Sequence, residues 1–446
     1  MEARKMKAEV SSSFWKVCAF VLLCAMQGTA SAAAPVVRNG SVTISQNASS
    51  RLVTVGYALD EAPGIVTVDF RTNDVSIGEQ NFAQLGGDVN CIVSVGDAKR
   101  IFWRPDKTWE GNRASNVTAV VTAWSPASPP DYMVIDLAGG VPKENVSFYV
   151  STNALPDGGL SNPIYATSKL VMRKIPAATV RWRMGTPSSQ YIAPNCATRE
   201  IPHYVTLTKD YYIGVYPVTQ GQNLLAFGRN YSAFSEYPDS PRRPANNANF
   251  NTIRGSSAGA GWPNADETVA RAVDNGTVIK AYRTVSGIES MDLPTDAQWE
   301  FAYRAGCSQN FYTGDNTFAS NDACLAAGIG LCGGSETYAV GQYTPNAWGI
   351  YDMGGNVWEY CLDWFAKNAT YSDGSEVVDP VGPTAAAVQA SEGYQTRVVR
   401  GGAYNVDWSN LRAASKSSAY PNASGDVSKT HGFRLVCDAD MTALAE

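Results

Sequence analysis

Residues 345–365 constrain the fold more than any other stretch of the chain. They read Pro-Asn-Ala-Trp-Gly-Ile-Tyr-Asp-Met-Gly-Gly-Asn-Val-Trp-Glu-Tyr-Cys-Leu-Asp-Trp-Phe, so aromatic rings alternate with glycines, carboxylates and amides. Gly354 and Gly355 would each cost about 1 kcal/mol relative to alanine inside a helix, so the stretch cannot be one regular helix. It predicts a buried, irregular segment that turns sharply and whose oxygen atoms converge.

Three other motifs accompany this stretch in a fixed order. They are Tyr-Ile-Gly-Val-Tyr-Pro-Val-Thr-Gln-Gly-Gln at 212–222, Leu-Pro-Thr-Asp-Ala-Gln-Trp-Glu-Phe-Ala-Tyr-Arg-Ala-Gly at 293–306, and Val-Val-Arg-Gly-Gly-Ala at 398–403 with Gly-Phe-Arg at 432–434. Together the four motifs resemble the formylglycine-generating enzyme (sulfatase-modifying factor) family. The resemblance implies a C-type-lectin-like α+β domain over residues 175–438, followed by a tail at 439–446. Because that family includes oxidases, other metal-dependent enzymes and binding proteins, it leaves the function open.

The amino terminus predicts export. Residues 1–34 combine a basic start, an apolar run at 17–26 and a small-residue cleavage site at Ala30-Ser31-Ala32, as a signal peptide does. The apolar run is too short to span a bilayer. We expect a periplasmic, cell-surface or extracellular protein without a membrane span, cleaved near Ala32–Ala34, with an uncleaved anchor as the alternative.

The charge balance argues against a nucleic-acid partner. The chain carries 35 basic and 41 acidic residues, a net charge of −6, and no strongly basic region. The partner expected from the sequence is an unknown protein or glycan ligand.

Residues 35–155 predict an all-β domain. Short runs with period-two alternation or β-branched side chains are separated by turn residues, as in an immunoglobulin- or fibronectin-III-like sandwich. The expected strands lie at 42–45, 52–57, 65–70, 92–95, 117–124 and 146–150. The following segment, 156–174, is rich in proline and glycine and is expected to be a linker.

Two helix starts carry a clear signal in the second domain. Thr219 is expected to cap a helix, and Thr295 followed by Gln298 forms a capping box for a helix at 296–305 that ends at Gly306. Trp299 is expected on the buried face of this helix.

Seven cysteines remain after the expected cleavage, and the odd number leaves at least one thiol free or intermolecular. Cys324 and Cys332 flank a glycine-rich loop that they could close. Cys361 fits equally well as a buried free thiol.

The family resemblance implies where copper-binding cysteines would lie if they were present. Its oxidases bind copper through two cysteines that follow the Arg-Gly-Gly motif, here Arg400-Gly401-Gly402. Counting from either side puts these positions near Val406 and Asp407, and no cysteine occurs between Cys361 and Cys437. Since thiolates select Cu(I), copper is not expected. His203 and His431 are expected to be surface or satisfied structural residues, which disfavours an iron site.

The resemblance also implies a structural calcium site in the aromatic stretch. By position, Asp352 and Glu359 would supply carboxylate oxygens, while Gly355 and Val357 would supply carbonyls. Alternatively, Asp352 and Glu359 cap buried amides or pair with Arg400 or Arg434, which are expected to be buried.

The stretch 403–431 is expected to form the ligand or partner surface. Tyrosine, serine and asparagine are typical of binding loops, although a merely soluble polar loop would look similar. The residues expected on this surface are Tyr404, Asn405, Asp407, Trp408, Tyr420 and Asn422. The sequence thus favours an exported, non-catalytic ligand- or protein-binding module with no catalytic residue assigned. An oxidoreductase acting on protein or small thiols through an unrecognised metal site is the alternative, and a structural envelope protein ranks third.

Overall fold

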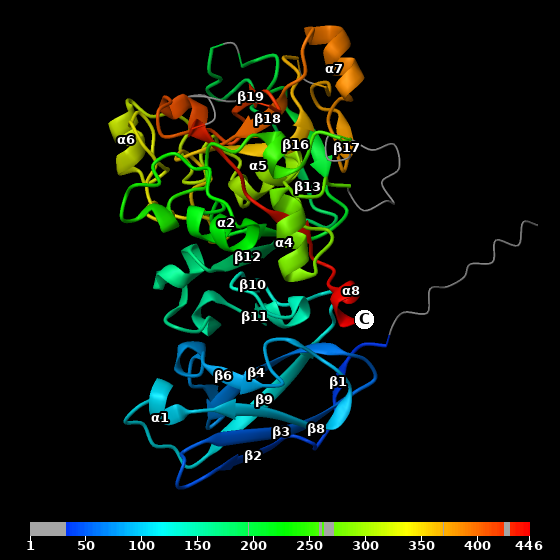
Figure 1. Cartoon of the computed structure of the whole chain (residues 1–446), viewed down its shortest axis with the longest axis vertical. Helices are drawn as coiled ribbons and strands as arrows, with labels where there is room; N and C mark the ends of the chain where they lie inside the picture. The colour runs from blue at the N-terminus through cyan, green and yellow to red at the C-terminus, as the bar shows by residue number, and fades with distance from the viewer. Residues whose placement is uncertain (1–32, 195, 258–260, 263–271, 369, 423–428) are drawn as a thin grey trace, which may run out of the picture. The chain divides into compact units, whose positions relative to one another are not determined.

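The computed structural model describes residues 33–194, 196–257, 261–262, 272–368, 370–422 and 429–446 (Figure 1). Nearly all of the expected signal peptide lies outside these ranges. Residues 34–446 form one unit. Within the described ranges, helices are too short or too polar to cross a bilayer.

Strands β1 to β9 form two antiparallel sheets with a common hydrophobic cluster. One sheet has the order β1-β3-β8-β6 with β2 on β3, and the other has β5-β4-β7 with β9 on β4. Val55, Phe70 and Trp103 are among the buried side chains that both sheets contribute to the cluster. The elements are β1 (Val36–Val37), β2 (Thr43–Gln46), β3 (Val53–Asp60), β4 (Gly64–Thr72), β5 (Val75–Ser76), η1 (Glu79–Asn81), β6 (Leu85–Gly87), β7 (Ile92–Val93), β8 (Gly96–Trp103), α1 (Pro105–Thr108) and β9 (Val117–Trp124).

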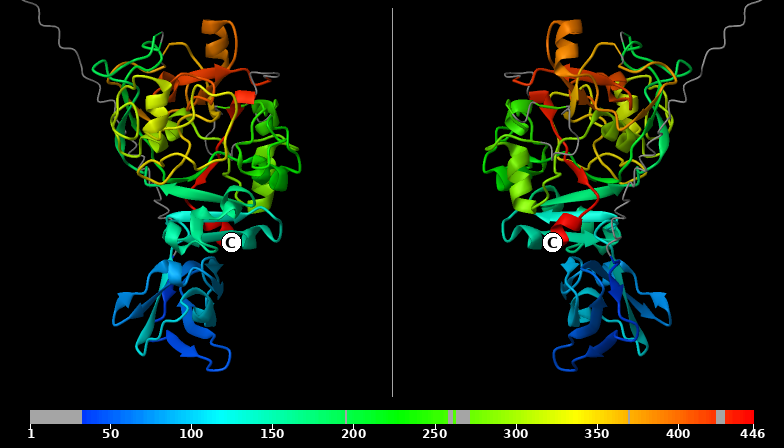
Figure 2. Two further views of the ribbon diagram at one scale, coloured as in Figure 1. Left: turned by 90° about the vertical axis from the view of Figure 1, so that its left-hand side faces the viewer. Right: turned by 90° about the vertical axis from the view of Figure 1, so that its right-hand side faces the viewer.

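A third sheet crosses the boundary expected near residue 155. It has the antiparallel order β11-β10-β12-β15-β21, and Figure 2 shows β21, in red, running back to this cyan and green sheet. Its strands are β10 (Tyr132–Asp136), β11 (Val146–Tyr149), β12 (Lys169–Ile175), β15 (Tyr211–Gly214) and β21 (Val436–Asp438). The strand expected at 146–150 exists, but it pairs here and not with the first two sheets.

Residues 169–174, the end of the expected linker, lie in β12, the central strand of that sheet. The reason lies in burial: four of the seven residues of β12 are buried between β10 and β15 and the other three are half-buried, and this pairing overrides the loop-like composition before it. The preceding segment holds short 3₁₀ turns η3 (Thr152–Ala154), η4 (Gly159–Ser161) and η5 (Pro163–Ala166), and η2 (Pro142–Asn145) precedes β11.

Two smaller sheets and short helices complete the chain, which is therefore mixed α+β and rich in sheet. One sheet joins β13 (Arg181–Met184), β14 (His203–Thr206) and β17 (Glu376–Val378), and the other has the order β19-β18-β16-β20. The remaining elements are α2 (Gln220–Phe227), η6 (Ser240–Arg242), α3 (Phe250–Ile253), α4 (Val278–Ser286), α5 (Asp296–Arg304), α6 (Asn321–Ala326), β16 (Trp358–Trp364), α7 (Ala385–Glu392), β18 (Arg397–Arg400), η8 (Trp408–Leu411), β19 (Lys416–Ala419), β20 (His431–Gly432) and α8 (Thr442–Ala445).

Both helix starts read from the sequence are confirmed. Thr219 with Gln222 and Thr295 with Gln298 form complete capping boxes on α2 and α5. The other end of α5 agrees with the expected stop at Gly306: the helix ends at Arg304, and both Ala305, with a φ of 45°, and Gly306, with a φ of 88°, have positive φ. Trp299 is fully buried, as predicted.

The aromatic stretch is irregular up to Val357 and then becomes β16, whose residues are all buried. Asn346 shapes the irregular part: its side chain donates to the Ala302 carbonyl at 2.7 Å and accepts from the Trp348 amide at 3.0 Å. The turn at Gly354-Gly355 then lies directly against a second glycine-rich loop, because a Cβ at Gly330 would come within 1.6 Å of the Gly354 carbonyl oxygen.

Candidate functional site

The aromatic stretch is anchored by a buried ion pair. Glu359, on β16, accepts hydrogen bonds from the Arg434 guanidinium at 2.8 Å and from the Trp299 indole at 2.6 Å. Arg434 also donates to the carbonyls of Gly214 and Tyr351 at 2.7 and 2.8 Å, and its side chain is fully buried. Both oxygens of Glu359 are therefore engaged by protein donors.

Asp352 differs from Glu359 because only one of its two carboxylate oxygens accepts a hydrogen bond among the described residues. Its backbone has a φ of 54°, and its Oδ2 accepts from the Gly341 amide at 2.6 Å. Its Oδ1 is buried without a hydrogen-bond partner among the described residues. Burial raises the pKa of this carboxyl to about 6, so an ionised Asp352 lacks compensation on one oxygen.

The four expected calcium ligands fit a metal ion unequally. Asp352 offers a free oxygen, whereas Glu359 is held by Arg434 and Trp299, and the Gly355 carbonyl accepts from the Val357 amide at 2.8 Å. Within the part of the chain described, no group of three or more histidine, cysteine or acidic side chains is arranged around a common metal position. Glu359 instead pairs with Arg434, which is the alternative that the sequence left open.

Arg400 belongs to a second buried network at the start of α5. It pairs with Asp296 and, at 3.0 Å, with Glu300. Lys416, on β19, reaches Asp296 at 3.1 Å. Arg400 is fully buried, as expected, so this network holds α5 against β18 and β19.

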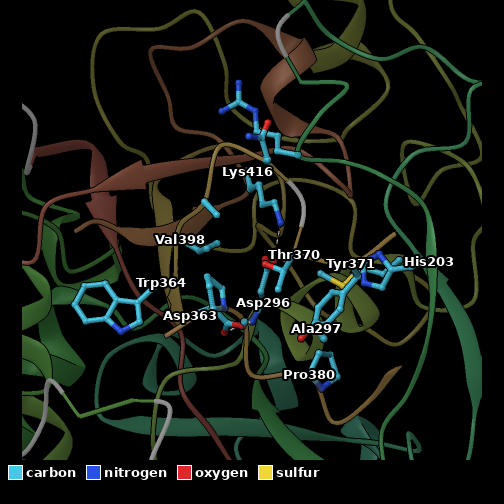
Figure 3. A pocket seen from close by; sticks show the side chains of 16 residues that line it. His203, Asp296, Ala297, Asp363, Trp364, Thr370, Tyr371, Pro380, Val398 and Lys416 are labelled. Carbon is cyan, nitrogen blue, oxygen red and sulfur yellow. Dashed lines mark hydrogen bonds and ion pairs between the residues drawn. The ribbon is translucent and has the colours of Figure 1, made fainter. Parts of the chain in front are cut away.

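A cavity of about 40 Å³ lies beside this network (Figure 3). Asp296 from α5, Asp363 from β16 and Lys416 from β19 meet on one side, and His203 and Tyr371 stack at 5.0 Å on another. The volume holds about three water molecules, far fewer atoms than a peptide or sugar.

The two carboxyl groups in the cavity differ in charge state. Burial opposes ionisation of Asp296, but Arg400 and Lys416 outweigh it and lower its pKa to about 2. Burial and the charge of Asp296 raise the pKa of Asp363 to about 7. Such divergence can support acid–base chemistry, and it also arises in structural networks.

His203 differs from the satisfied residue that the sequence predicted. Its Nδ1 lies 3.0 Å from the Ile201 carbonyl, but its Nε2 is buried without a partner among the described residues. His431 lies on β20, in another sheet. The sequence offered no signal for this cavity, because its walls come from β13, β14, α5, β16, β18, β19 and the loops between them.

The expected ligand surface is split. Tyr404 is 6% exposed, whereas Asn405 and Asp407 are exposed, and Trp408 is half-buried beside Tyr191 at 5.4 Å. Tyr420 is 54% exposed, and its ring lies 6.2 Å from that of Tyr394. The rings beside Tyr404 and Trp408 are different ones, Phe234 and Tyr191. Asn422 is exposed close to Tyr420 in the chain, and residues 423–428 of the expected surface lie outside the described ranges.

Tyr404 belongs to a group that we call the aromatic patch: Phe234, Tyr237, Arg243, Tyr338 and Tyr404. Phe234 packs edge-on against Tyr404 at 5.8 Å, and the Arg243 guanidinium lies 4.0 Å from the Tyr237 ring and 5.9 Å from that of Tyr338. Phe234 has a φ of 62°, which is strained for a bulky residue and common near functional sites. Sequence reasoning missed all members except Tyr404, because they come from loops far apart in the chain.

The positions expected for copper ligands are filled by apolar packing. Val406 packs, together with Trp408, against a cluster that contains Leu411, Cys324 and Cys332. In the described residues the seven cysteines Cys91, Cys196, Cys307, Cys324, Cys332, Cys361 and Cys437 are free thiols.

These features define a class of protein: a sheet-rich α+β domain whose glycine-broken aromatic segment is anchored by buried arginine–carboxylate pairs. Residues 174–439 match the family model described as the sulfatase-modifying factor enzyme 1-like domain. The chain belongs to this family.

Individual relatives match shorter stretches. Over 169 residues the chain is 36% identical to the formylglycine-generating enzyme of Streptomyces coelicolor. The aligned region covers 34% of this chain and 48% of that enzyme. Over 142 residues it is 32% identical to the serine/threonine-protein kinase pkn1 of Chlamydia pneumoniae, covering 32% of this chain and 20% of the kinase. Among solved structures, Treponema denticola variable protein 1 aligns with a TM-score of 0.43 and 25% identity over 60% of this chain and 95% of that chain. The chain thus spans about half or less of these curated relatives.

Proposed function

We propose that this chain is an exported, non-catalytic ligand- or protein-binding member of its family that lacks the copper-binding cysteine pair. In this proposal the family domain has a C-type-lectin-like fold and follows an immunoglobulin- or fibronectin-III-like sandwich. The aromatic patch and the neighbouring segment 404–408 contact a protein or glycan ligand. Tyr420 and Asn422 form a separate, second contact.

One observation carries the proposal. Where the family resemblance puts copper ligands, Val406 contributes an apolar side chain to packing and Asp407 caps η8 by accepting from the Ser409 amide at 2.9 Å. Neither side chain is a soft thiolate, which Cu(I) requires. Beside them, the exposed ring of Tyr338 and the half-buried rings of Phe234 and Tyr237 give the rigid aromatic area that binding surfaces use.

The alternative, an oxidoreductase with an unrecognised metal site, has one supporting observation. Cys324 and Cys332 belong to the same cluster as Leu411, and Val406 packs against it. A metal held by these two thiols would lie close to the position that the resemblance gives for copper.

A turnover assay separates the two functions. We expect the mature chain, loaded with copper and supplied with oxygen, to leave a cysteine-containing peptide unoxidised by mass spectrometry. The formylglycine-generating enzyme of Streptomyces coelicolor, treated identically, is the positive control. Repeated turnover by this chain would refute the non-catalytic proposal and favour the oxidoreductase.

Calcium remains part of the proposal in a narrower form. Its support is the buried, unpartnered Oδ1 of Asp352. Carbonyls of Gly355 and Val357 and water would complete the oxygen shell that calcium prefers. Glu359 is left out, because its oxygens already accept from Arg434 and Trp299.

The substitution Asp352→Asn tests this site. The folded-state pKa of about 6 lies above the value of about 3.9 for an unfolded aspartate. Burial of Asp352 therefore favours folding below pH 4, and this contribution is lost as the pH rises through 6, a difference of about 3 kcal/mol. At pH 8 in EDTA we expect the variant to be more stable than the wild type in urea unfolding.

Added calcium should reverse that order. Under the proposal, calcium stabilises the wild type and leaves Asp352→Asn unchanged, while magnesium, which demands a stricter octahedral shell, has a smaller effect. If calcium shifts neither protein, the site does not bind it.

A further inference from the structure

The loop that joins α6 to Tyr338 of the aromatic patch folds back on itself. The Gly328 amide donates to the Leu325 carbonyl at 2.9 Å and the Ile329 amide to the Cys324 carbonyl at 3.4 Å. This tight turn returns the chain so that Cys324 and Cys332 pack in the same buried cluster, together with Leu411. Cys324 is 0% and Cys332 is 2% exposed.

The same loop bridges two segments that matter for the proposed function. On one side the Leu331 carbonyl accepts from the Asn356 amide of the aromatic stretch at 3.1 Å. On the other, the amides of Gly333 and Gly334 donate to the carbonyls of Val406 and Tyr404 at 2.8 and 2.6 Å. Asn321, at the start of α6, also accepts from the Trp408 amide at 2.8 Å. The conformation of 404–408 therefore depends on this loop.

We propose that Cys324 and Cys332 form a disulfide in the mature protein, and that this bond holds residues 321–334 in the conformation that hydrogen-bonds to the segment 404–408. The two side chains already lie in one buried cluster, with seven residues between them in the chain, so the bond closes a short loop. The link to binding rests on the proposed function, whereas the disulfide itself does not.

The chemistry is thiol–disulfide exchange with a low-molecular-weight disulfide such as glutathione disulfide, which reaches the two thiols when the loop is open, because both are buried in the closed loop. The Cys332 thiolate attacks one sulfur of the oxidant, forms a mixed disulfide and releases one thiolate. Cys324 gives its proton to that thiolate, attacks the Cys332 sulfur and releases the second thiolate, which takes the proton lost by Cys332. Two protein thiols and one small disulfide thus become one protein disulfide and two small thiols.

The local chemistry favours this order of events. The neighbouring Cys324 thiol lowers the pKa of Cys332, while the Cys332 thiol, followed by burial, raises the pKa of Cys324. A thiolate stabilised by a neighbouring thiol is the usual attacking group of a reactive cysteine pair. By contrast, burial, followed by the charge of nearby carboxylates, raises the pKa of Cys361 and Cys437, which keeps both as thiols.

Peptide mapping of the full chain tests the bond directly. The protein is equilibrated with reduced and oxidised glutathione, free thiols are alkylated after acid quenching, and the chain is cut with a protease that cleaves after leucine. Leu325 and Leu331 lie between the two cysteines, so the bond appears as two linked peptides. We expect this linkage in the wild type and in the control Cys307→Ser, and its loss in Cys332→Ser.

Stability and fluorescence measure the consequence. Closing so short a loop should raise the unfolding temperature of oxidised over reduced wild type by roughly 5 °C, with no such difference in Cys332→Ser. The Trp408 contribution, obtained by subtracting the emission of Trp408→Phe, should shift to longer wavelength on reduction. This last readout reports the link to segment 404–408 without any ligand.

Three outcomes would overturn the proposal. The first is full alkylation of both Cys324 and Cys332 under oxidising conditions, and the second is a disulfide from either of them to a different cysteine. Retention of about one copper per chain by the reduced pair, lost in Cys332→Ser, would assign the thiols to a metal instead. A mapped disulfide in a protein that still oxidises thiol peptides would refute the proposed function alone.

Discussion

Replacing Arg434 by methionine should lower the free energy of unfolding by about 3–5 kcal/mol, because it leaves Glu359 charged and buried without its cation. The change also removes the donors that satisfy the carbonyls of Gly214 and Tyr351. Equilibrium unfolding in urea measures the loss, provided that the denaturant slope is unchanged.

A matched control separates burial from charge. Arg38 pairs with Asp60 at 2.7 Å, as close as a buried pair, but its side chain is 50% exposed. Arg38→Met should therefore change stability little, since solvent already screens that pair. A loss as large as that of Arg434→Met would contradict the argument.

The double substitution Glu359→Leu with Arg434→Met gives the sharper result. Removing both charges abolishes the unpaired carboxylate, so the double variant should be more stable than Arg434→Met alone. If it is less stable, then the hydrogen bonds to Trp299, Gly214 and Tyr351, rather than the charge pair, dominate this core.

Local signals in the sequence were sufficient where neighbours along the chain decide the structure. The capping boxes at Thr219 and Thr295 depend on residues three positions apart, and both are present. The glycine pair at 354–355 likewise predicted the sharp turn that precedes β16, because glycine tolerates conformations that other residues avoid.

Sequence-based prediction failed where the interacting residues come from segments that lie far apart in the chain. The composition around Gly158 and Pro163 indicates a linker, yet β12 follows at Lys169 and pairs with strands on both sides. Glu359 has the same sequence context whether it binds calcium or pairs with Arg434, and only the fold brings Arg434 to it. The cavity beside Asp363 and the aromatic patch have the same origin, since each is assembled from separate elements.

Replacing Gly330 by alanine should cost about 3 kcal/mol or more, the range of severe overpacking in a rigid site. The new Cβ would lie 1.6 Å from the Gly354 carbonyl oxygen and 2.6 Å from its carbon, and both are backbone atoms that cannot rotate away. Relief requires that the loop move off the Gly354-Gly355 turn. That movement would break the hydrogen bond from the Asn356 amide to the Leu331 carbonyl.

Gly334→Ala is the matched control in the same loop. Its added Cβ would lie 3.4 Å from the Tyr404 carbonyl oxygen, an ordinary contact, so the stability should stay within about 0.5 kcal/mol of the wild type. Urea unfolding of both variants, with hydrogen exchange at the Asn356 amide, measures the difference. Equal stability of the two variants would mean that the loop yields easily. In that case the loop could not transmit the redox state of Cys324 and Cys332 to the segment 404–408. A large loss of stability in Gly330→Ala, with faster exchange confined to the Asn356 amide, would identify the loop as the rigid support of that segment.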